Sequence, residues 1–209
     1  MMKKARIAVL VSGGGTNLQA LIDAERDGVI KHGEIVLVLS SNPHAYALKR
    51  AETAGIPSCT VERASFETQR RFEDAIRSRL AEYRADLIVL AGFMSILSGE
   101  FTSEYPDRII NVHPSLIPSF CGKGYHGLRV HEAALKKGVK VTGATVHFVN
   151  EIPDGGKIIM QKAVCVEDGD TPETLQRRVM EQAEWKILPA SVEKVCAELL
   201  KKGDYYGEV

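Results

Sequence analysis

The sequence predicts an α/β fold: one mostly parallel sheet with helices on both faces and an antiparallel extension near the C-terminus. Short, wholly apolar runs recur through the first half, and stretches of helical length separate them. Two further β-rich segments then follow each other with only a turn between them. This alternation implies right-handed crossovers between parallel strands, a Rossmann-like arrangement in which ligands bind at the carboxyl ends of the strands.

The first half supplies strands and helices in turn. The expected strands are short and apolar throughout, and they cover residues 7–11, 35–39 and 87–90. The expected helical segments are amphipathic: a helix that ends near Gly28, a helix over residues 46–54 and a charged stretch over residues 66–83.

The second half is less regular. Residues 109–114 predict a short strand that Pro114 cuts off, and the Gly-rich residues 115–127 predict a loop. A helix is expected over residues 128–137. Residues 141–149 and 157–166 are β-rich and predict an antiparallel pair.

The last part of the chain predicts helix. Thr171 is an expected N-cap because Pro172 follows it at the first helical position. One long helix is expected from there to about Leu188, with Pro189 as a kink or break before a final helix.

Length and composition indicate a single domain over residues 1–209. Lys and Arg number 27, as do Asp and Glu, so the net charge is zero. A balanced charge argues against a protein that coats nucleic acid or an anionic membrane, and no apolar run approaches the roughly 18 residues of a membrane helix. The four cysteines lack the spacing of a disulfide framework, which favours reduced thiols in a cytoplasmic protein. We expect a monomer or a homodimer.

A Gly-rich motif follows the first strand and reads Ser-Gly-Gly-Gly-Thr-Asn over residues 12–17. Free backbone N–H groups and the dipole of the following helix predict a phosphate site there. The motif lacks the Lys-Ser/Thr pair of a P-loop, and Leu18 occupies the position of the third glycine of a dinucleotide site. A phosphomonoester therefore fits better than a dinucleotide, and a flexible turn without a ligand is the alternative.

Two polar residues share one side of the strand at residues 109–114. Asn111 and His113 are two positions apart, so both side chains project the same way from its carboxyl end. An amide and an imidazole can stabilise an oxyanion, although a structural polar pair is equally compatible with the pattern. Asp154, before Gly155 and Gly156, fits a common hairpin turn, and it gains meaning only beside His113. The three side chains together suit the addition of an amine to a carbonyl carbon.

These motifs, together with Ala-Gly-Phe-Met-Ser-Ile-Leu at residues 91–97, resemble the 10-formyltetrahydrofolate-dependent formyltransferases. The Gly-rich loop narrows the resemblance to the branch that formylates phosphoribosylglycinamide. The resemblance extends from about Arg6 to Pro189 and keeps the motifs in the family's order. It implies transfer of a formyl group from 10-formyltetrahydrofolate to the amine of N1-(5-phosphoribosyl)glycinamide, in de novo purine synthesis and without a metal.

The resemblance also implies a role for each motif. Asn111 and protonated His113 would stabilise the oxyanion, and Asp154 would raise the pKa of His113 and relay a proton through water. The residues implied for the ribonucleotide are Gly13, Gly14, Gly15, Thr16, Asn17 and Glu184. Those implied for the folate are Met94, Ser95, Ile96, Leu97 and Asn111. Phosphate binding would thus fall to about residues 1–105, and catalysis and most folate contacts to about residues 106–209.

Some positions depart from the family pattern. Arg often occupies the place of Ser95, and a basic residue that contacts the folate tail would fall at Gln69, with Arg70 and Arg71 adjacent. Pro153 replaces a larger aliphatic residue and is expected to stiffen the loop before Asp154. These differences leave recognition of the tail open.

Other residues receive a structural interpretation. Cys121, His126 and His131 lack the spacing of zinc ligands, and His147 is expected to be a structural histidine. The loop over residues 118–127 is expected to be a mobile cover of the site.

Three other functions remain open. They are a hydrolase that releases formate from the same cofactor, a formyltransferase for another amino substrate, and a non-catalytic nucleotide-binding module. The chain length predicts neither the C-terminal domain of the initiator-tRNA formyltransferases nor the N-terminal domain of the formyltetrahydrofolate hydrolases.

Overall fold

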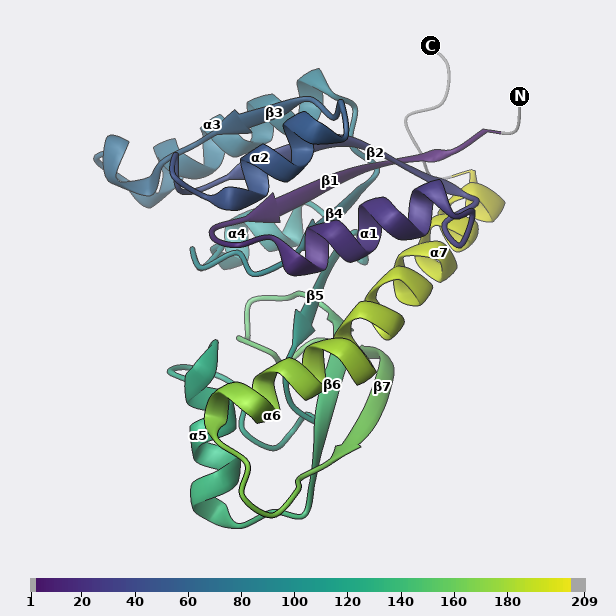
Figure 1. Cartoon of the computed structure of the whole chain (residues 1–209). Helices are drawn as coiled ribbons and strands as arrows, with labels where there is room; N and C mark the ends of the chain where they lie inside the picture. Colours follow the sequence, from purple (N-terminus) through teal and green to yellow (C-terminus); the bar gives the residue numbers. More distant parts are fainter. Residues whose placement is uncertain (1–2, 204–209) are drawn as a thin grey trace.

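The computed structural model describes residues 3–203, which form one seven-stranded sheet with helices on both faces (Figure 1). The strands are β1 (Ala5–Val11), β2 (Gly33–Ser40), β3 (Ser58–Thr60), β4 (Leu87–Leu90), β5 (Ile109–His113), β6 (Val141–Phe148) and β7 (Ile158–Cys165). The helices are α1 (Thr16–Arg26), α2 (Tyr46–Thr53), α3 (Gln69–Glu82), α4 (Gly99–Ser103), α5 (Leu128–Lys137), α6 (Pro172–Val179) and α7 (Trp185–Lys202).

The sheet has the order β3-β2-β1-β4-β5-β6-β7. The first five strands in this order are parallel, and β6 and β7 are antiparallel to their neighbours. The predicted α/β class and the antiparallel extension are therefore confirmed. The direction of winding reverses between β1 and β4, and a reversal of this kind leaves a crevice beyond the carboxyl ends of the two strands.

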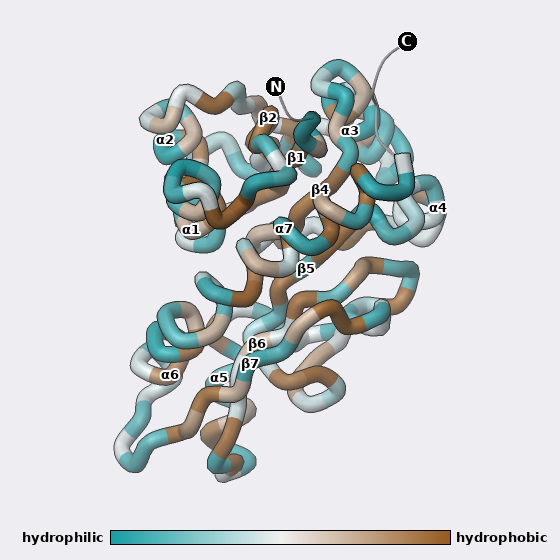
Figure 2. Tube along the Cα trace, turned by 90° about the vertical axis from the view of Figure 1, so that its right-hand side faces the viewer, coloured by the Kyte–Doolittle hydropathy of each residue, from teal (hydrophilic) through white to brown (hydrophobic). Residues whose placement is uncertain are grey.

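The buried strands are apolar because both of their faces are covered. Side chains alternate along β1, so Ile7 and Val9 face one hydrophobic core while Ala8 and Leu10 face the other. Helices α1, α2, α6 and α7 contribute to the first core, whereas α3 and α4 contribute to the second. Figure 2 shows the hydrophobic segments gathered along the strands through the middle of the molecule.

The C-terminal helices differ from the prediction. No break occurs at Pro189, which lies inside α7. The irregularity comes earlier, in a π-helical segment, Met180–Glu184, that joins α6 to α7. A proline ring collides with the carbonyl four residues before it in a regular helix, here that of Trp185. Trp185 has ψ −6°, which turns this carbonyl away from its regular position and lets the helix continue through Pro189.

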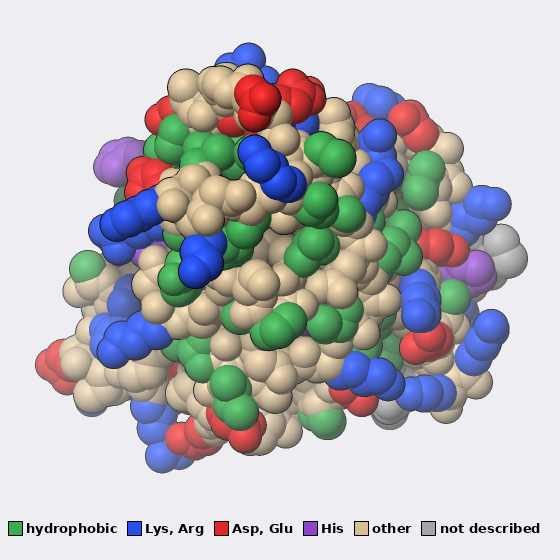
Figure 3. Space-filling model, turned by 90° about the horizontal axis from the view of Figure 1, so that it is seen from below, with side chains coloured by type: hydrophobic (Ala, Val, Ile, Leu, Met, Phe, Trp, Pro, Cys, Tyr) green, Lys and Arg blue, Asp and Glu red, His purple; other side chains and the backbone are tan. Residues whose placement is uncertain are grey.

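Three short elements were not expected from the sequence: β3, the 3-10 turn Arg63–Ser65 and α4. Each has five or fewer residues, so none carries enough periodicity to predict. None of the described helices is long and apolar enough to cross a membrane. On the face shown in Figure 3, Lys and Arg side chains alternate with Asp and Glu and form no broad basic patch.

Candidate active site

The candidate site lies where β1, β4 and β5 end, at the reversal of the strand order. The Gly-rich loop follows β1, and residues 91–98 follow β4. Asn111 and His113 lie in the C-terminal part of β5. Asp154 comes from the loop between β6 and β7. Segments that are far apart in the sequence are thus adjacent at one edge of the sheet (Figure 1).

The Gly-rich loop presents unpaired N–H groups next to the start of α1. Gly15 is the N-cap of α1, with φ 70°, and no side chain caps the helix. No acceptor within residues 3–203 takes a hydrogen bond from the N–H of Gly13, Gly14 or Gly15. The space where a Cβ of Gly13 or Gly14 would lie is empty to 4 Å. An anion can therefore approach this backbone closely and meet the positive end of the helix dipole.

Glu184 lies beside this loop, although 167 residues separate it from Asn17. The Asn17 Nδ2 donates a hydrogen bond to Glu184 Oε2 over 2.7 Å. Burial raises the pKa of Glu184 to about 7, and the hydrogen bond from Asn17 only partly opposes this effect. The Asn17 Oδ1 is buried and has no partner among the described residues. The structure thus brings together two residues that the resemblance links to the ribonucleotide.

Asn111, His113 and Asp154 also lie together, and His147 joins them. The Asp154 Oδ2 is 3.5 Å from His113 Nδ1, and its Oδ1 is 3.5 Å from His147 Nε2. The Asn111 Nδ2 lies 3.2 Å from the same His147 nitrogen. His147, expected from the sequence to be a structural histidine, is buried and lies between two of the predicted catalytic side chains, Asn111 and Asp154.

The contacts of His147 suit both the neutral and the protonated form of its ring. Its Nδ1 is 2.7 Å from the carbonyl of Phe148 and therefore carries a proton. In the neutral ring, Nε2 accepts a hydrogen bond from Asn111; in the protonated ring, Nε2 donates one to Asp154. The ring can therefore pass a proton to or from the carboxylate of Asp154.

His113 is almost completely buried, and both of its nitrogens face the protein. Its Nε2 donates to the carbonyl of Phe120 over 2.8 Å, while Nδ1 faces Asp154. Burial lowers the pKa of His113 below 6.5, and the carboxylate of Asp154 opposes this shift without cancelling it. Asp154 therefore acts on the pKa of His113 in the expected direction, but desolvation has the larger effect.

Asp154 is held as a carboxylate. Burial by itself raises its pKa, but the hydrogen bond from His147, the charge of His113 and the N–H of Gly122 together hold this pKa below 3.8. The contacts of Phe120 and Gly122 tie the loop over residues 118–127 to the predicted catalytic groups. No sequence pattern marks these contacts, because both use backbone atoms.

The residues implied for the folate line a pocket of about 150 Å³ next to these groups. Its lining includes Met94, Ser95, Ile96 and Leu97 from the loop after β4, with Asn111, His147, Pro153 and Asp154 opposite. The N–H of Met94 donates to the Ser12 hydroxyl over 2.9 Å, so this loop touches the Gly-rich loop. Ile96 is 73% exposed, which leaves apolar surface for a ring to cover.

Gln69, which stands where the family pattern places a basic residue, makes its hydrogen bonds within the protein. The Gln69 amide donates to the carbonyl of Ile96 over 2.9 Å and to Glu73 over 2.7 Å. Its Oε1 accepts from Arg63 over 3.1 Å. A guanidinium, that of Arg63, is therefore in direct contact with Gln69.

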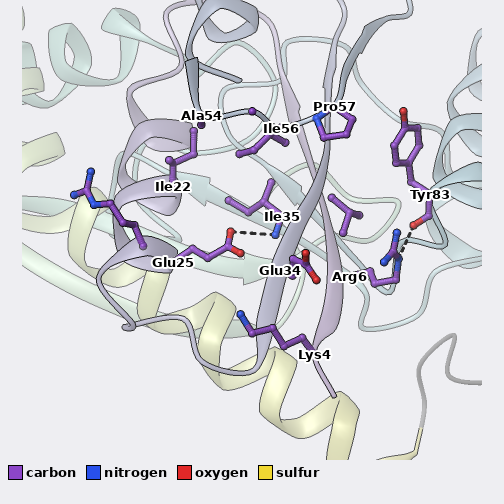
Figure 4. A pocket seen from close by; sticks show the side chains of 13 residues that line it. Lys4, Arg6, Ile22, Glu25, Glu34, Ile35, Ala54, Ile56, Pro57 and Tyr83 are labelled. Atoms are coloured by element: carbon purple, nitrogen blue, oxygen red, sulfur yellow. Dashed lines mark hydrogen bonds between the residues drawn. The ribbon is translucent and has the colours of Figure 1, made fainter. Parts of the chain in front are cut away.

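A second pocket lies away from the predicted catalytic groups. A pocket of about 630 Å³ opens at the amino ends of β1 and β2, with Lys4, Arg6, Glu25 and Glu34 around it (Figure 4). This is the opposite end of the strands from the predicted catalytic groups. Within residues 3–203, no three His, Cys, Asp or Glu side chains are grouped to hold a metal ion.

The chain is similar in sequence and in structure to known formyltransferases. The pattern of the formyl transferase family matches residues 5–192. The trifunctional purine biosynthetic protein adenosine-3 of Homo sapiens is 45% identical over 202 residues, which are 97% of this chain but 19% of that protein. The chain thus spans about a fifth of that relative.

Shorter relatives align over most of their length. Phosphoribosylglycinamide formyltransferase of Haemophilus influenzae is 44% identical over 90% of this chain and 84% of that protein. A crystal structure of glycinamide ribonucleotide transformylase 1 from Symbiobacterium toebii superposes with a TM-score of 0.87 at 42% identity, covering 93% of this chain and 89% of that one. On this match of sequence and structure, the chain belongs to the formyl transferase family.

Proposed function

We propose that this chain transfers the formyl group of 10-formyltetrahydrofolate to the amine of N1-(5-phosphoribosyl)glycinamide. The products are the N2-formyl ribonucleotide and tetrahydrofolate, in de novo purine biosynthesis. The names of the relatives from Haemophilus influenzae and Symbiobacterium toebii support this substrate. The enzyme acts on small molecules as a monomer or homodimer, with no nucleic acid or membrane partner.

One observation carries the proposal: a cradle of free N–H groups lies beside a cluster of Asn111, His113 and Asp154. A hydrolase of the folate alone has no use for the cradle. A nucleotide-binding module has no use for a buried imidazole and carboxylate 3.5 Å apart. Both features are needed when a phosphorylated amine must meet a formyl donor.

The reaction is direct transfer. The substrate amine attacks the formyl carbon, and negative charge develops on the formyl oxygen. The amide of Asn111 and the Nε2–H of His113 stabilise that charge. Because the Phe120 carbonyl accepts the hydrogen bond of Nε2, this carbonyl must yield its place to the oxyanion. The charge of the oxyanion then favours the protonated imidazole, which burial alone disfavours.

Proton transfer follows from the arrangement around Asp154. The attacking nitrogen loses a proton and the leaving nitrogen of the folate gains one. Asp154, ionised and between two imidazoles, accepts the first proton through water, and His147 shares it through Nε2. The same groups return this proton through water to the leaving nitrogen, so Asp154 is again a carboxylate at the end of the reaction. The folate pterin occupies the pocket after β4, where backbone groups of residues 94–97 and apolar side chains hold it.

The test is a steady-state assay of formyl-donor consumption with purified chain, the ribonucleotide and 10-formyltetrahydrofolate. We expect Asp154→Asn and His113→Ala each to lower kcat by about 100-fold, the usual size of an acid–base or oxyanion contribution. Asp168→Asn and His44→Ala, two exposed positions, serve as matched controls and retain wild-type rates.

This assay, together with calorimetry, separates the other functions. Near-normal turnover in Asp154→Asn and His113→Ala would contradict the assigned mechanism. Donor consumption without the ribonucleotide would indicate a hydrolase. Calorimetric binding of the ribonucleotide without turnover of any formyl donor would indicate a binding module.

A further inference from the structure

Three carbonyl groups of the Gly-rich loop, those of Ser12, Gly13 and Gly14, accept hydrogen bonds from other parts of the protein. The Ser12 carbonyl accepts from Asn42 Nδ2 over 3.3 Å, and the Gly13 carbonyl from the N–H of Ala47 over 3.1 Å. The Gly14 carbonyl accepts from Arg50 Nε over 2.8 Å. Two of these three donors belong to α2, and Asn42 belongs to the loop that precedes it.

These contacts fix the direction of the N–H groups. A trans peptide is planar, so the carbonyl of one residue and the N–H of the next point to opposite sides. Holding the carbonyls of Ser12, Gly13 and Gly14 toward α2 therefore turns the N–H groups of Gly13, Gly14 and Gly15 away from it. The same three N–H groups have no acceptor in the described part of the chain. The result is three successive backbone donors without an acceptor within residues 3–203, an arrangement that can bind an anion.

Arg50 is itself restrained on the carbonyl side of the loop. Its Nη1 donates to Gln19 Oε1 over 3.0 Å, and its guanidinium lies 5.1 Å from the centre of the Tyr46 ring. The side chain is only partly buried, so its hydrogen bonds do not serve to fill the core. Arg50 donates to the carbonyl of the Gly14–Gly15 peptide, so it lies on the side of this peptide opposite to the Gly15 N–H.

We propose that Arg50 is a positioning residue for the phosphate of the substrate. It holds the Gly14 carbonyl and thereby aims the Gly15 N–H into the cradle, without touching the phosphate. The ligand class is a phosphomonoester, and the inference rests on the proposed function of the loop. A guanidinium suits this task because Nε and Nη1 bind two acceptors, Gly14 and Gln19, in one fixed plane.

The test compares Arg50→Met with Lys49→Met. Both variants lose one positive charge from adjacent positions of α2, but Lys49 is exposed and pairs only with Glu52 in the described structure. The measurements are KM for the ribonucleotide, KM for 10-formyltetrahydrofolate, kcat, the inhibition constant of inorganic phosphate, and Tm.

For Arg50→Met we expect KM for the ribonucleotide and the inhibition constant of phosphate to rise about tenfold, the effect of one lost hydrogen bond to a charged group. KM for the folate, kcat and Tm stay near wild type. Lys49→Met changes each constant less than twofold. Arg50→Lys supplies an ammonium group without the planar fork of the guanidinium, so its KM for the ribonucleotide lies between those of the wild type and Arg50→Met.

Several outcomes would overturn the proposal. If Arg50→Met matches Lys49→Met while the wild type turns over the ribonucleotide, Arg50 has no positioning role and the proposed function stands. A lower Tm with equal changes in both KM values would assign Arg50 a purely structural role. If Arg50→Met does not fold, a folded Arg50→Lys with wild-type KM refutes the role. A wild type that neither uses the ribonucleotide nor is inhibited by phosphate refutes the proposed function itself.

Discussion

The buried carboxyl of Glu184 makes the stability of this protein depend on pH. Its pKa is about 7 in the folded chain against 4.5 for an ordinary glutamate, because burial penalises the charged form. A raised carboxyl pKa means that the folded state binds the proton more tightly. The free energy of unfolding therefore falls as pH rises from about 4.5 to about 7, and it levels off above that range.

The magnitude follows from the two pKa values. Their difference, about 7 minus 4.5, is about 2.5, and each pKa unit corresponds to about 1.4 kcal/mol, so ionised Glu184 costs about 3 kcal/mol at pH 8. Glu184→Gln keeps an oxygen for Asn17 and removes the titration. We expect urea unfolding to show the variant about 3 kcal/mol more stable than wild type at pH 8 and nearly equal to it at pH 4.5.

Glu181→Gln is the matched control. Glu181 lies in the same π-helical segment, but it is exposed, so its removal leaves the pH dependence of the wild type. The reasoning is refuted if Glu184→Gln is less stable than wild type at pH 8, or if the difference between the two proteins is the same at pH 4.5 and pH 8.

Three further predictions concern the site. In Asp154→Asn, the pKa of His113 falls further below 6.5 because the opposing carboxylate is lost; an NMR titration of the imidazole that showed an unchanged or higher value would contradict this. His147→Phe lowers kcat by about tenfold or more and leaves KM for the ribonucleotide near wild type, since it removes the contacts to Asn111 and Asp154 along with the hydrogen bond to the Phe148 carbonyl; a kcat equal to that of the wild type in the steady-state assay would show that His147 has only a structural role. Gly15→Ala loses about 2 kcal/mol or more of stability, because φ is 70° and the new Cβ would lie 2.7 Å from that of Ala47, whereas Gly14→Ala keeps its Tm and raises KM for the ribonucleotide; equal Tm values in thermal melts would refute the contrast.

The sequence predicts most of the sheet because its signals there are local. The runs around Ile7, Leu37 and Ile88 are apolar since both faces of their strands are buried. They are also too short for a buried helix and rich in β-branched residues, and these two signals indicate strands. The break predicted at Pro189 is wrong for a physical reason. A proline normally ends a helix, and here the altered ψ of Trp185 makes room for its ring.

The site is predicted less completely because several of its contacts are not local. Asn111 and His113 share a strand face, so their spacing reveals them. His147 is opposite Asn111 only through the register of β5 against β6, which no sequence spacing contains. Arg50 acts through a carbonyl of Gly14, and Phe120 through its own carbonyl; neither contact depends on a side-chain pattern that could be read.

The charge balance of the chain fits this way of holding a phosphate. A site made of Lys and Arg side chains needs positive charges that face the ligand, and the 27 Lys and Arg of this chain are balanced by 27 Asp and Glu, so no net positive charge attracts an anion. Backbone N–H groups need no charge, but they bind an anion well only if they point in one direction before it arrives. Here α2 supplies that order: the N–H of Ala47 and the guanidinium of Arg50 fix two carbonyls of the loop. The guanidinium of Arg50, on the carbonyl side of the loop, orients the N–H donors. Affinity for the phosphate therefore depends on the preorganisation of these donors more than on the net charge of the chain.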